Sequence, residues 1–356
     1  MRIPVFKSML VLGAIASACV AATTASAHSS APAAKAATTD VCVLLPDTKT
    51  SVRWELFDRP YLAAAFKKAG LKADITNALG DAQKMRSQAD DCVTNGAKVA
   101  LIVALDAGSA TSSTKALIAG GVKVIDYDRL TPSSGAAYYV SFDNVLVGKL
   151  QGKGLVGGLK ANGEYSKTPV IAELNGDIKD NNAKLFKQGY DSILNPLYKA
   201  GTFKKATAGD QWTAWDPVKG QTIFEGMLAR NSNNINGVLA ANDGLAGAVV
   251  ATLKNKGLKP IPLTGQDATP TGLQYILAGW QTGTVYKSVR LEANAAAAVA
   301  IKLIKGGTVK TNGKVSGTPS VLLTPQWVTK ANHNILFTDN FVKKSAVCVG
   351  AYKKYC

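Results

Sequence analysis

The sequence predicts an α/β protein with two Rossmann-like lobes, whose parallel sheets are joined by a multi-strand hinge. Short apolar segments rich in β-branched residues alternate with longer amphipathic segments, which is typical of parallel strands connected by helices. The chain has 356 residues, which suits two domains. A polar cluster also follows nearly every apolar segment.

Six apolar segments are predicted to be strands covered on both faces, because they contain almost no polar residues. They are Val41–Leu45, Val99–Ala104, Val122–Ile125, Val170–Leu174, Gly237–Ala241 and Ile261–Thr264. Helices are predicted at Arg59–Ala69, Ala82–Asn95, Gly108–Ala119, Ala183–Leu194, Lys219–Arg230 and Leu245–Lys256. The strands fall into two groups, before and after about residue 145, which predicts one half of the fold for each lobe.

Three passages between the lobes are predicted, at Val140–Asn144, Thr284–Ser288 and Pro319–Gln326. They assign residues 40–143 and 289–310 to the first lobe, and residues 144–288 and 318–347 to the second. Residues 348–356 form a C-terminal tail. A chain that crosses repeatedly between two lobes makes a hinge.

The N-terminus predicts export. Arg2 and Lys7 precede an apolar run, Met9–Ala22, and Ala25-Ser26-Ala27 has the small-x-small pattern of a cleavage site. Residues 1–27 are therefore expected to be a signal peptide, and residues 28–39 a flexible tether. The alternative is a lipid anchor on Cys19, since the residues before it resemble a weak lipobox. The protein is thus expected in the periplasm or on the outer face of the cell membrane.

Four cysteines remain if Cys19 is set aside, and an even number suits an oxidising compartment. Three pairings are open. We expect Cys348–Cys356, which closes a small loop, and this leaves Cys42–Cys92. Four buried free thiols are the alternative.

The composition is globular, with 47% hydrophobic and 18% charged residues, and the formal net charge is +17. Only seven of the 41 basic residues are Arg, and the Lys residues are scattered. Nucleic-acid readers cluster their basic residues and rely on Arg. We therefore expect a solvated, Lys-rich surface and no nucleic-acid partner.

The polar clusters at the strand ends predict where a ligand binds. They contain Asp47, Asp106, Asp126 with Asp128, Asp177 with Asp180, Asn242 with Asp243, and Gln266 with Asp267. Ligands of open parallel sheets bind at the carboxyl ends of the strands. Turns also favour Asp and Asn for local reasons, but six clusters in one topological place, interleaved with Trp and Arg, favour a site.

The residues favour binding over catalysis. His28 and His333 are the only histidines, and the sequence has no P-loop, no dinucleotide motif and no metal-ligand spacing. We expect no cofactor, no metal and no enzymatic activity. A pair of carboxylates for glycosidase chemistry is the alternative.

A sugar needs planar hydrogen-bonding groups and an aromatic surface for its C–H face. The chain offers these groups in short motifs at Arg53-Trp54, Asp128-Arg129, Asp180-Asn181-Asn182, Trp212 with Trp215, Asn242-Asp243, Asp267 and Lys287. The more ordinary interpretations are core packing for Trp212 and helix capping for Asp243. Asn182 could also be only a helix N-cap.

The order of these motifs resembles that of the D-xylose-binding proteins of bacterial ABC importers, which have the type I periplasmic-binding-protein fold. The resemblance covers about Val41 to Ile304 and includes Tyr127-Asp128-Arg129, Ser141-Phe142-Asp143-Asn144 and Val285-Tyr286-Lys287. It departs at residues 48–52, where the expected charge pattern is absent, and it does not include Cys348–Cys356.

The resemblance implies a monosaccharide-binding protein, with D-xylose as the first candidate, that closes two lobes on its ligand and serves a membrane permease as a monomer. It implies hydrogen bonds to the sugar from Arg53, Asp128, Arg129, Asp180, Asn182, Asn242, Asp267 and Lys287, and stacking by Trp54 and Trp215. Two alternatives remain open. One is a sugar sensor that docks on a membrane receptor, and the other is a broad aldose binder that also takes glucose, arabinose and galactose.

Overall fold

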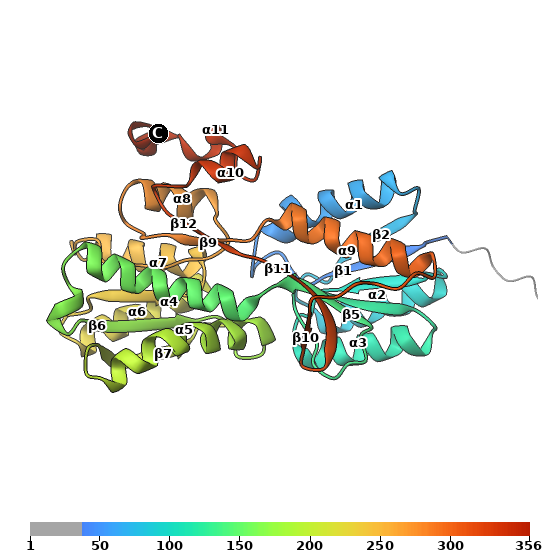
Figure 1. The fold of residues 1–356 in the computed structure, drawn as a ribbon, viewed down its shortest axis with the longest axis horizontal. Coiled ribbons are helices and arrows are strands. Elements are labelled where there is room, and N and C mark those ends of the chain that lie inside the picture. Colours follow the sequence, from blue (N-terminus) through green and yellow to red (C-terminus); the bar gives the residue numbers. More distant parts are fainter. Residues whose placement is uncertain (1–37) are drawn as a thin grey trace, which may run out of the picture. The chain divides into compact units, whose positions relative to one another are not determined.

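The computed structural model describes residues 38–356, which form two α/β lobes (Figure 1). The expected signal peptide, most of the expected tether and Cys19 lie outside the described residues. Within the described part of the chain, no helix is long and apolar enough to cross a membrane.

The first lobe is built on a seven-stranded sheet in the order β10-β11-β5-β4-β3-β1-β2. Its strands are β1 Val41–Leu45, β2 Ala73–Asn77, β3 Val99–Ile102, β4 Lys123–Tyr127, β5 Tyr138–Phe142, β10 Gly313–Val315 and β11 Thr318–Leu323. All neighbours are parallel except β10 and β11.

Alternate residues of β1 explain why this strand is apolar throughout. Val41 and Val43 pack with α1 Arg59–Lys68 and α9 Val289–Ile304, whereas Cys42 and Leu44 pack with α2 Ala82–Thr94 and α3 Ala107–Ala119. Successive side chains of a strand point to opposite faces, so a sheet covered on both faces needs no polar side. A one-turn π-helix, η1 Trp54–Asp58, precedes α1.

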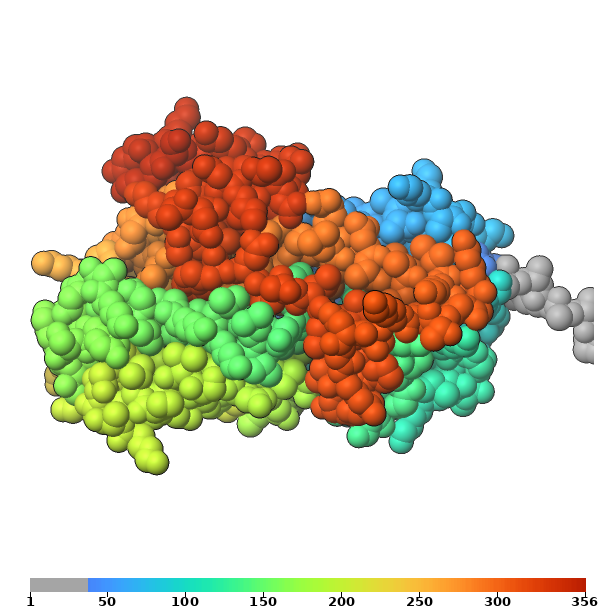
Figure 2. Space-filling model, in the orientation of Figure 1, coloured from blue at the N-terminus to red at the C-terminus, as the bar shows by residue number. Residues whose placement is uncertain are grey.

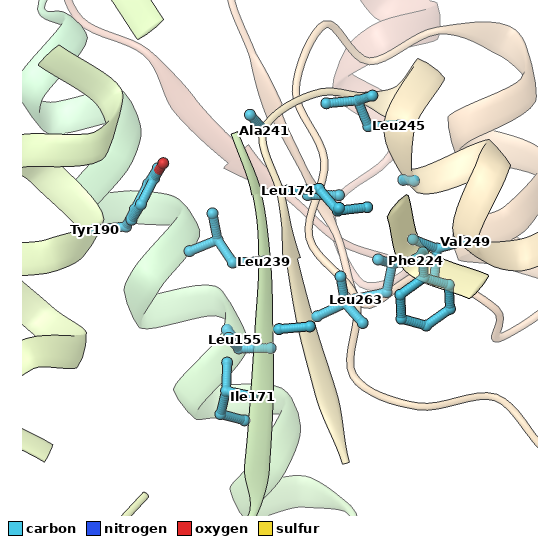
Figure 3. Close-up of a cluster of buried hydrophobic side chains, with 14 of the residues drawn as sticks. Leu155, Ile171, Leu174, Tyr190, Phe224, Leu239, Ala241, Leu245, Val249 and Leu263 are labelled. Atoms are coloured by element: carbon cyan, nitrogen blue, oxygen red, sulfur yellow. The ribbon is translucent and has the colours of Figure 1, made fainter. Parts of the chain in front are cut away.

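The second lobe has a three-stranded sheet in the order β7-β6-β8. Its elements are α4 Asn144–Ala161, β6 Val170–Asn175, α5 Asn181–Lys199, β7 Lys204–Trp212, α6 Pro217–Arg230, β8 Gly237–Ala240, α7 Asp243–Asn255 and α8 Pro270–Leu277, with a short 3-10 turn η2 at Tyr165–Lys167. Figure 3 shows its core, where Leu174 and Leu239 of the sheet lie among side chains such as Leu155, Phe224 and Val249.

Helices α4 and α5 lie unusually close to each other because glycines face each other at their contact. A Cβ atom at Gly148 would lie 1.9 Å from the carbonyl oxygen of Phe186, and one at Gly189 would lie 2.2 Å from that of Val145. Any side chain at either position would push the helices apart. This contact fixes the first turns of α5, which carry Asn182 and Phe186.

The chain passes between the lobes near Asp143, between β9 Thr284–Tyr286 and α9, and between β11 and β12 Gln326–Val328. Strands β9 and β12 pair antiparallel. The C-terminal segment then folds as α10 Asn334–Thr338, α11 Lys344–Val347 and the 3-10 turn η3 Gly350–Tyr355, and it packs on α8 (Figure 1).

The structure differs from the sequence predictions in several places. Ile261–Thr264 is not a regular strand, because only Leu263 bridges to Val238 of β8. Residues 318–323 were assigned to the second lobe, yet as β11 they pair with β5 in the first sheet, from Ser320 opposite Tyr139 to Leu323 opposite Phe142. This pairing satisfies backbone groups that β5 would otherwise expose at the sheet edge. Strands β2, β5 and β7 and helices α4, α8 and α9 were not predicted.

Two disulfides join Cys42 to Cys92 and Cys348 to Cys356, which is the expected pairing. Cys42 lies on the face of β1 that α2 covers, and Cys92 lies in α2. The first bond therefore fastens a helix to the central sheet of the first lobe.

Candidate functional site

A pocket of about 340 Å³ lies where the two lobes meet, at the carboxyl ends of the strands. All ten residues expected to bind ligand line it, namely Arg53, Trp54, Asp128, Arg129, Asp180, Asn182, Trp215, Asn242, Asp267 and Lys287. Thr50, Ser51, Phe186 and Gln266 complete the lining.

Loops and helix starts after successive strands present these side chains. In the first lobe, Arg53 follows β1, and Asp128 follows β4 directly. In the second lobe, Asp180 caps α5 after β6, Trp215 follows β7, and Asn242 caps α7 after β8. Lys287 comes directly after β9, in one of the linkers. The pocket therefore draws on both lobes and on the hinge.

Arg53 is buried and is held by three carboxylates. Its Nε and Nη2 donate to the two oxygens of Asp58 at 2.9 and 2.8 Å, Nη1 donates to Asp128 Oδ2 at 2.7 Å, and Nη2 donates to Glu292 Oε2 at 2.6 Å. The Tyr127 hydroxyl also donates a hydrogen bond to Asp58 Oδ1, at 2.5 Å. Guanidinium has five N–H groups, and these four bonds leave one Nη1 hydrogen for a ligand.

Asp128 has a left-handed backbone, with φ of 59°, which non-glycine residues rarely adopt. Its carbonyl oxygen accepts hydrogen bonds from Asn182 Nδ2 at 2.7 Å, from the Tyr139 hydroxyl at 2.8 Å and from Ser141 Oγ at 2.9 Å. These bonds fix the carboxylate of Asp128 between Arg53 and the pocket. One of them comes from the second lobe, since Asn182 lies in α5.

Arg129 and Asp180 face each other from opposite lobes. Arg129 Nε lies 3.5 Å from Asp180 Oδ2, and Arg129 Nη2 donates to Thr50 Oγ1 at 2.9 Å. Asp180 also accepts from the indole Nε1 of Trp215 at 3.1 Å. Arg129 is 6% exposed, so it is not a surface ion-pair residue.

Asp267, Asn242 and Lys287 keep polar atoms without partners among the described residues. The Asp267 carboxylate accepts no hydrogen bond, and Lys287 Nζ stands 3.9 Å from both Asp267 Oδ1 and Asp128 Oδ2. Asn242 uses Oδ1 to cap α7 through Leu245 N at 2.9 Å, which leaves its Nδ2 hydrogens. Asn242 and Lys287 are buried, the Asp267 side chain is 18% exposed, and all three line the pocket, so these atoms are available to a polar ligand.

The backbone at the pocket is strained in three places. Asp267 has φ of 92° and Trp215 has φ of 58°, in addition to Asp128. Such conformations cost energy and persist at functional sites where the surroundings hold them. Here they aim two carboxylates and one indole into the same pocket.

The aromatic groups of the pocket differ in two respects from the expected pair, Trp54 and Trp215. Trp54 is 2% exposed, and the guanidinium carbons of Arg53 and Arg129 lie 4.7 and 5.3 Å from its ring centroid, so cations already cover part of the ring. Phe186, which is not among the residues predicted from the sequence, lines the pocket and meets Trp215 edge to face, with ring centroids 6.3 Å apart. Phe186 follows Asn182 by four residues, one helical turn, and this spacing could have identified it.

Burial sets the protonation of the carboxylates around Arg53. It raises the pKa of Glu292 to about 8, although the positive charge of Arg53 acts in the opposite direction. It also raises the pKa of Asp58 and of Asp180. Burial acts on Asp128 too, but Arg53, Lys287 and Arg129 together hold its pKa below the usual value. Asp128 therefore stays ionised beside the pocket.

The residues that cap the N-termini of α7 and α5 differ from those expected. Asn242, not Asp243, caps α7. Asp243 is buried instead and accepts hydrogen bonds from Gln281 Nε2 and the Thr284 hydroxyl, both at 2.9 Å. At α5 the cap is Asp180, which accepts from Asn182 N at 2.9 Å, so Asn182 is not the cap. Trp212 packs against the second-lobe core, as expected.

No group of three or more His, Cys, Asp or Glu residues within residues 38–356 has a metal-binding arrangement.

Comparison with known proteins identifies the family. The chain is 35% identical over 300 residues to the D-xylose-binding periplasmic protein of Escherichia coli (strain K12), covering 82% of this chain and 88% of that protein. It is 33% identical over 330 residues to the multiple sugar-binding periplasmic receptor ChvE of Rhizobium radiobacter, covering 87% and 92%.

The fold is similar to the crystal structure of an ABC transporter solute-binding protein from Clostridium phytofermentans with bound β-D-glucose, with a TM-score of 0.79 and 25% identity over 86% of this chain and 99% of that one. The family model described as a periplasmic binding protein domain matches residues 41–308. This chain belongs to the periplasmic binding protein family.

Proposed function

We propose that this protein captures a monosaccharide, D-xylose in the first place, between its two lobes and delivers it to the membrane permease of an ABC importer. The observation that carries the proposal is the pocket at the lobe junction, where Asp267, Asn242 and Lys287 have polar atoms with no hydrogen-bond partner among residues 38–356, beside Trp215 and Phe186. Vicinal hydroxyls match such atoms, and the C–H face of a pyranose matches the aromatic rings. The D-xylose-binding relatives support D-xylose as the first sugar to test.

The proposed mechanism is closure of the lobes. A sugar that contacts residues of both lobes binds the closed arrangement more tightly and shifts the population toward it. Two carboxylates of the pocket, Asp128 and Asp180, are paired with Arg53 and Arg129, which favours fixed hydrogen bonding over proton transfer. We therefore propose binding without chemical conversion, by a monomeric, exported protein. Whether it is freely secreted or anchored through Cys19 is decided by mass spectrometry of the mature N-terminus.

Calorimetric titration with D-xylose, L-arabinose, D-ribose, D-glucose and D-galactose tests the proposal. We expect saturable binding with one sugar per protein, tightest for D-xylose. Comparable affinity for several aldoses would instead assign a broad sugar binder, as the multiple sugar-binding relative suggests. Absence of binding by all five sugars would contradict the proposal.

A further inference from the structure

The C-terminal segment, residues 326–356, contacts both lobes outside the sugar pocket. One apolar cluster contains Leu336, Phe341 and Val347 of this segment together with Leu273 and Leu277 of α8 in the second lobe. Phe57 and Tyr61 of the first lobe pack against the same cluster. Figure 2 shows this segment, in red, lying over the orange part of the chain that contains α8 and β9.

Phe341 lies between two elements that carry pocket residues. Its ring stacks on Phe57 with centroids 4.9 Å apart, and it lies equally close, at 4.9 Å, to Tyr286. Phe57 belongs to the π-helical turn that begins directly after Arg53, and Tyr286 immediately precedes Lys287. Phe341 is 6% exposed, so this ring is packed rather than solvated.

Asp339, in the same segment, makes polar contacts with the linker around Lys287. Its carboxylate accepts hydrogen bonds from the Tyr286 hydroxyl, from Ser288 Oγ at 3.1 Å, and from Arg290 Nη2. Ser288 and Arg290 flank the start of α9, the helix by which the chain returns to the first lobe. Asp339 thus holds the linker on both sides of Lys287.

The rest of the segment is fastened to the second lobe. Strand β12 pairs with β9, Gln274 Nε2 donates to the Val347 carbonyl at 3.0 Å, and Tyr352 meets Tyr275 of α8 edge to face at 6.3 Å. The disulfide Cys348–Cys356 closes the end. Phe341 and Asp339 therefore project from a segment anchored on one lobe toward groups that belong to the other lobe or to the linker.

Phe341 also reaches the edge of the sugar pocket. It lines an apolar cavity of about 480 Å³ together with Phe57, and this cavity shares Arg53, Asp267 and Lys287 with the sugar pocket. Phe341 does not line the sugar pocket itself, but it shares this cavity with three residues that are proposed to bind the sugar.

We propose that Phe341 and Asp339 are positioning residues for the sugar site, which hold η1 and the linker at Lys287 in the arrangement that the sugar needs. Their contacts between the lobes stabilise the arrangement in which the lobes approach each other. Without them, the closed state is less populated, and the apparent affinity for sugar falls by the same factor. This inference rests on the proposed sugar binding only for its affinity readout.

The test compares Phe341→Ala and Asp339→Ala with wild type and with Tyr352→Ala. Tyr352 is the matched control, since it is an aromatic residue of the same segment whose ring contacts lie within the segment and α8. We expect the dissociation constant for D-xylose to rise on the order of 3- to 30-fold in the two variants. We expect Tyr352→Ala to stay within about twofold of wild type and Phe341→Tyr to restore the affinity, because it keeps the ring.

Small-angle X-ray scattering of the same proteins without sugar gives the second readout. We expect a larger radius of gyration for Phe341→Ala and Asp339→Ala than for wild type and Tyr352→Ala. Unchanged scattering and unchanged affinity in both variants would overturn the inference, as would losses matched by Tyr352→Ala. If wild type binds no sugar, the proposed function fails while the scattering comparison still decides this inference.

Discussion

The side-chain amide of Asn182, in the second lobe, donates a hydrogen bond at 2.7 Å to the backbone carbonyl of Asp128, in the first lobe. The Tyr139 hydroxyl lies 2.8 Å from the same carbonyl and 3.0 Å from Asn182 Oδ1, so its one hydrogen is shared between these two acceptors. The lobes are therefore linked by a direct bond at the wall of the pocket, and a sugar adds to a contact that already exists.

Replacing Asn182 should weaken sugar binding. Asn182→Ala removes the bond to Asp128, and a hydrogen bond worth about 1–1.5 kcal/mol corresponds to an increase in the dissociation constant of roughly tenfold. Asn182→Asp should be worse, because it places a carboxylate against the Asp128 carbonyl. Calorimetric titration with D-xylose measures both. Asn181→Ala is the control, since Asn181 does not line the pocket; equal losses at 181 and 182 would contradict the assignment.

Asp267→Ala should abolish measurable sugar binding and leave the fold intact. The Asp267 side chain accepts no hydrogen bond from the described residues, so its removal orphans no donor other than Lys287, 3.9 Å away. A sugar hydroxyl would lose its charged acceptor, which is more costly than losing a neutral one. Circular dichroism checks the fold and calorimetry checks the binding. Asp177→Ala, at another strand end outside the pocket, should bind normally.

Arg129→Ala should also abolish binding, but at a cost in stability. Arg129 is the charged partner of Asp180 across the lobes, and an unpaired buried carboxylate is destabilising by several kcal/mol. We therefore expect a lower melting temperature together with the loss of D-xylose binding. Arg129→Lys keeps the charge and should recover part of the stability. Retention of wild-type affinity by Arg129→Ala would exclude Arg129 from the site.

Stability should fall as the pH rises from about 5 to 8.5. Burial raises the pKa of Glu292 to about 8 and those of Asp126 and Asp243 to about 7, from usual values of 4.5 and 3.8. Between these values the folded protein binds more protons than the unfolded chain, so the free energy of unfolding decreases with rising pH.

Melting temperatures across this range measure the effect. Glu292→Gln removes one of the three groups and should reduce the decrease between pH 7 and pH 8.5 most. A melting temperature that rises from pH 5 to pH 8.5 would show that these carboxylates are not protonated in the folded protein.

The Cys42–Cys92 disulfide should stabilise the fold without affecting sugar binding. It closes a loop with a sequence separation of 50, for which chain entropy gives about 4 kcal/mol. The double variant Cys42→Ala, Cys92→Ala should unfold at a clearly lower denaturant concentration and bind D-xylose with unchanged affinity. A weaker affinity in native conditions would mean that the bond also shapes the pocket.

The sequence predicted the strands that are apolar throughout, such as Val41–Leu45, because their pattern depends on burial on both faces. It missed β2, whose residues are only partly buried, and β7, which begins with Lys204 and Lys205. It also missed α9, whose run of alanines gives little amphipathic contrast. Strand β11 was placed in the wrong lobe because its partner, β5, lies far away in the sequence.

The sequence predicted which residues line the pocket between the lobes. The ten residues were chosen by their position at strand ends and by the order of their motifs, and all ten line one pocket. Glu292 and Asp58, which hold Arg53, could not be found in this way. Glu292 lies 239 positions from Arg53 in a helix that the pattern did not reveal, and Asp58 lies within a π-helical turn whose spacing differs from that of an α-helix.

Tryptophan fluorescence during titration with monosaccharides tests the central claim most directly, because Trp54 and Trp215 line the pocket. We expect a saturable change with D-xylose in wild type, and a smaller change in Trp215→Phe. A flat response of the wild-type protein to every pentose and hexose would contradict the claim that the pocket between the lobes binds a sugar.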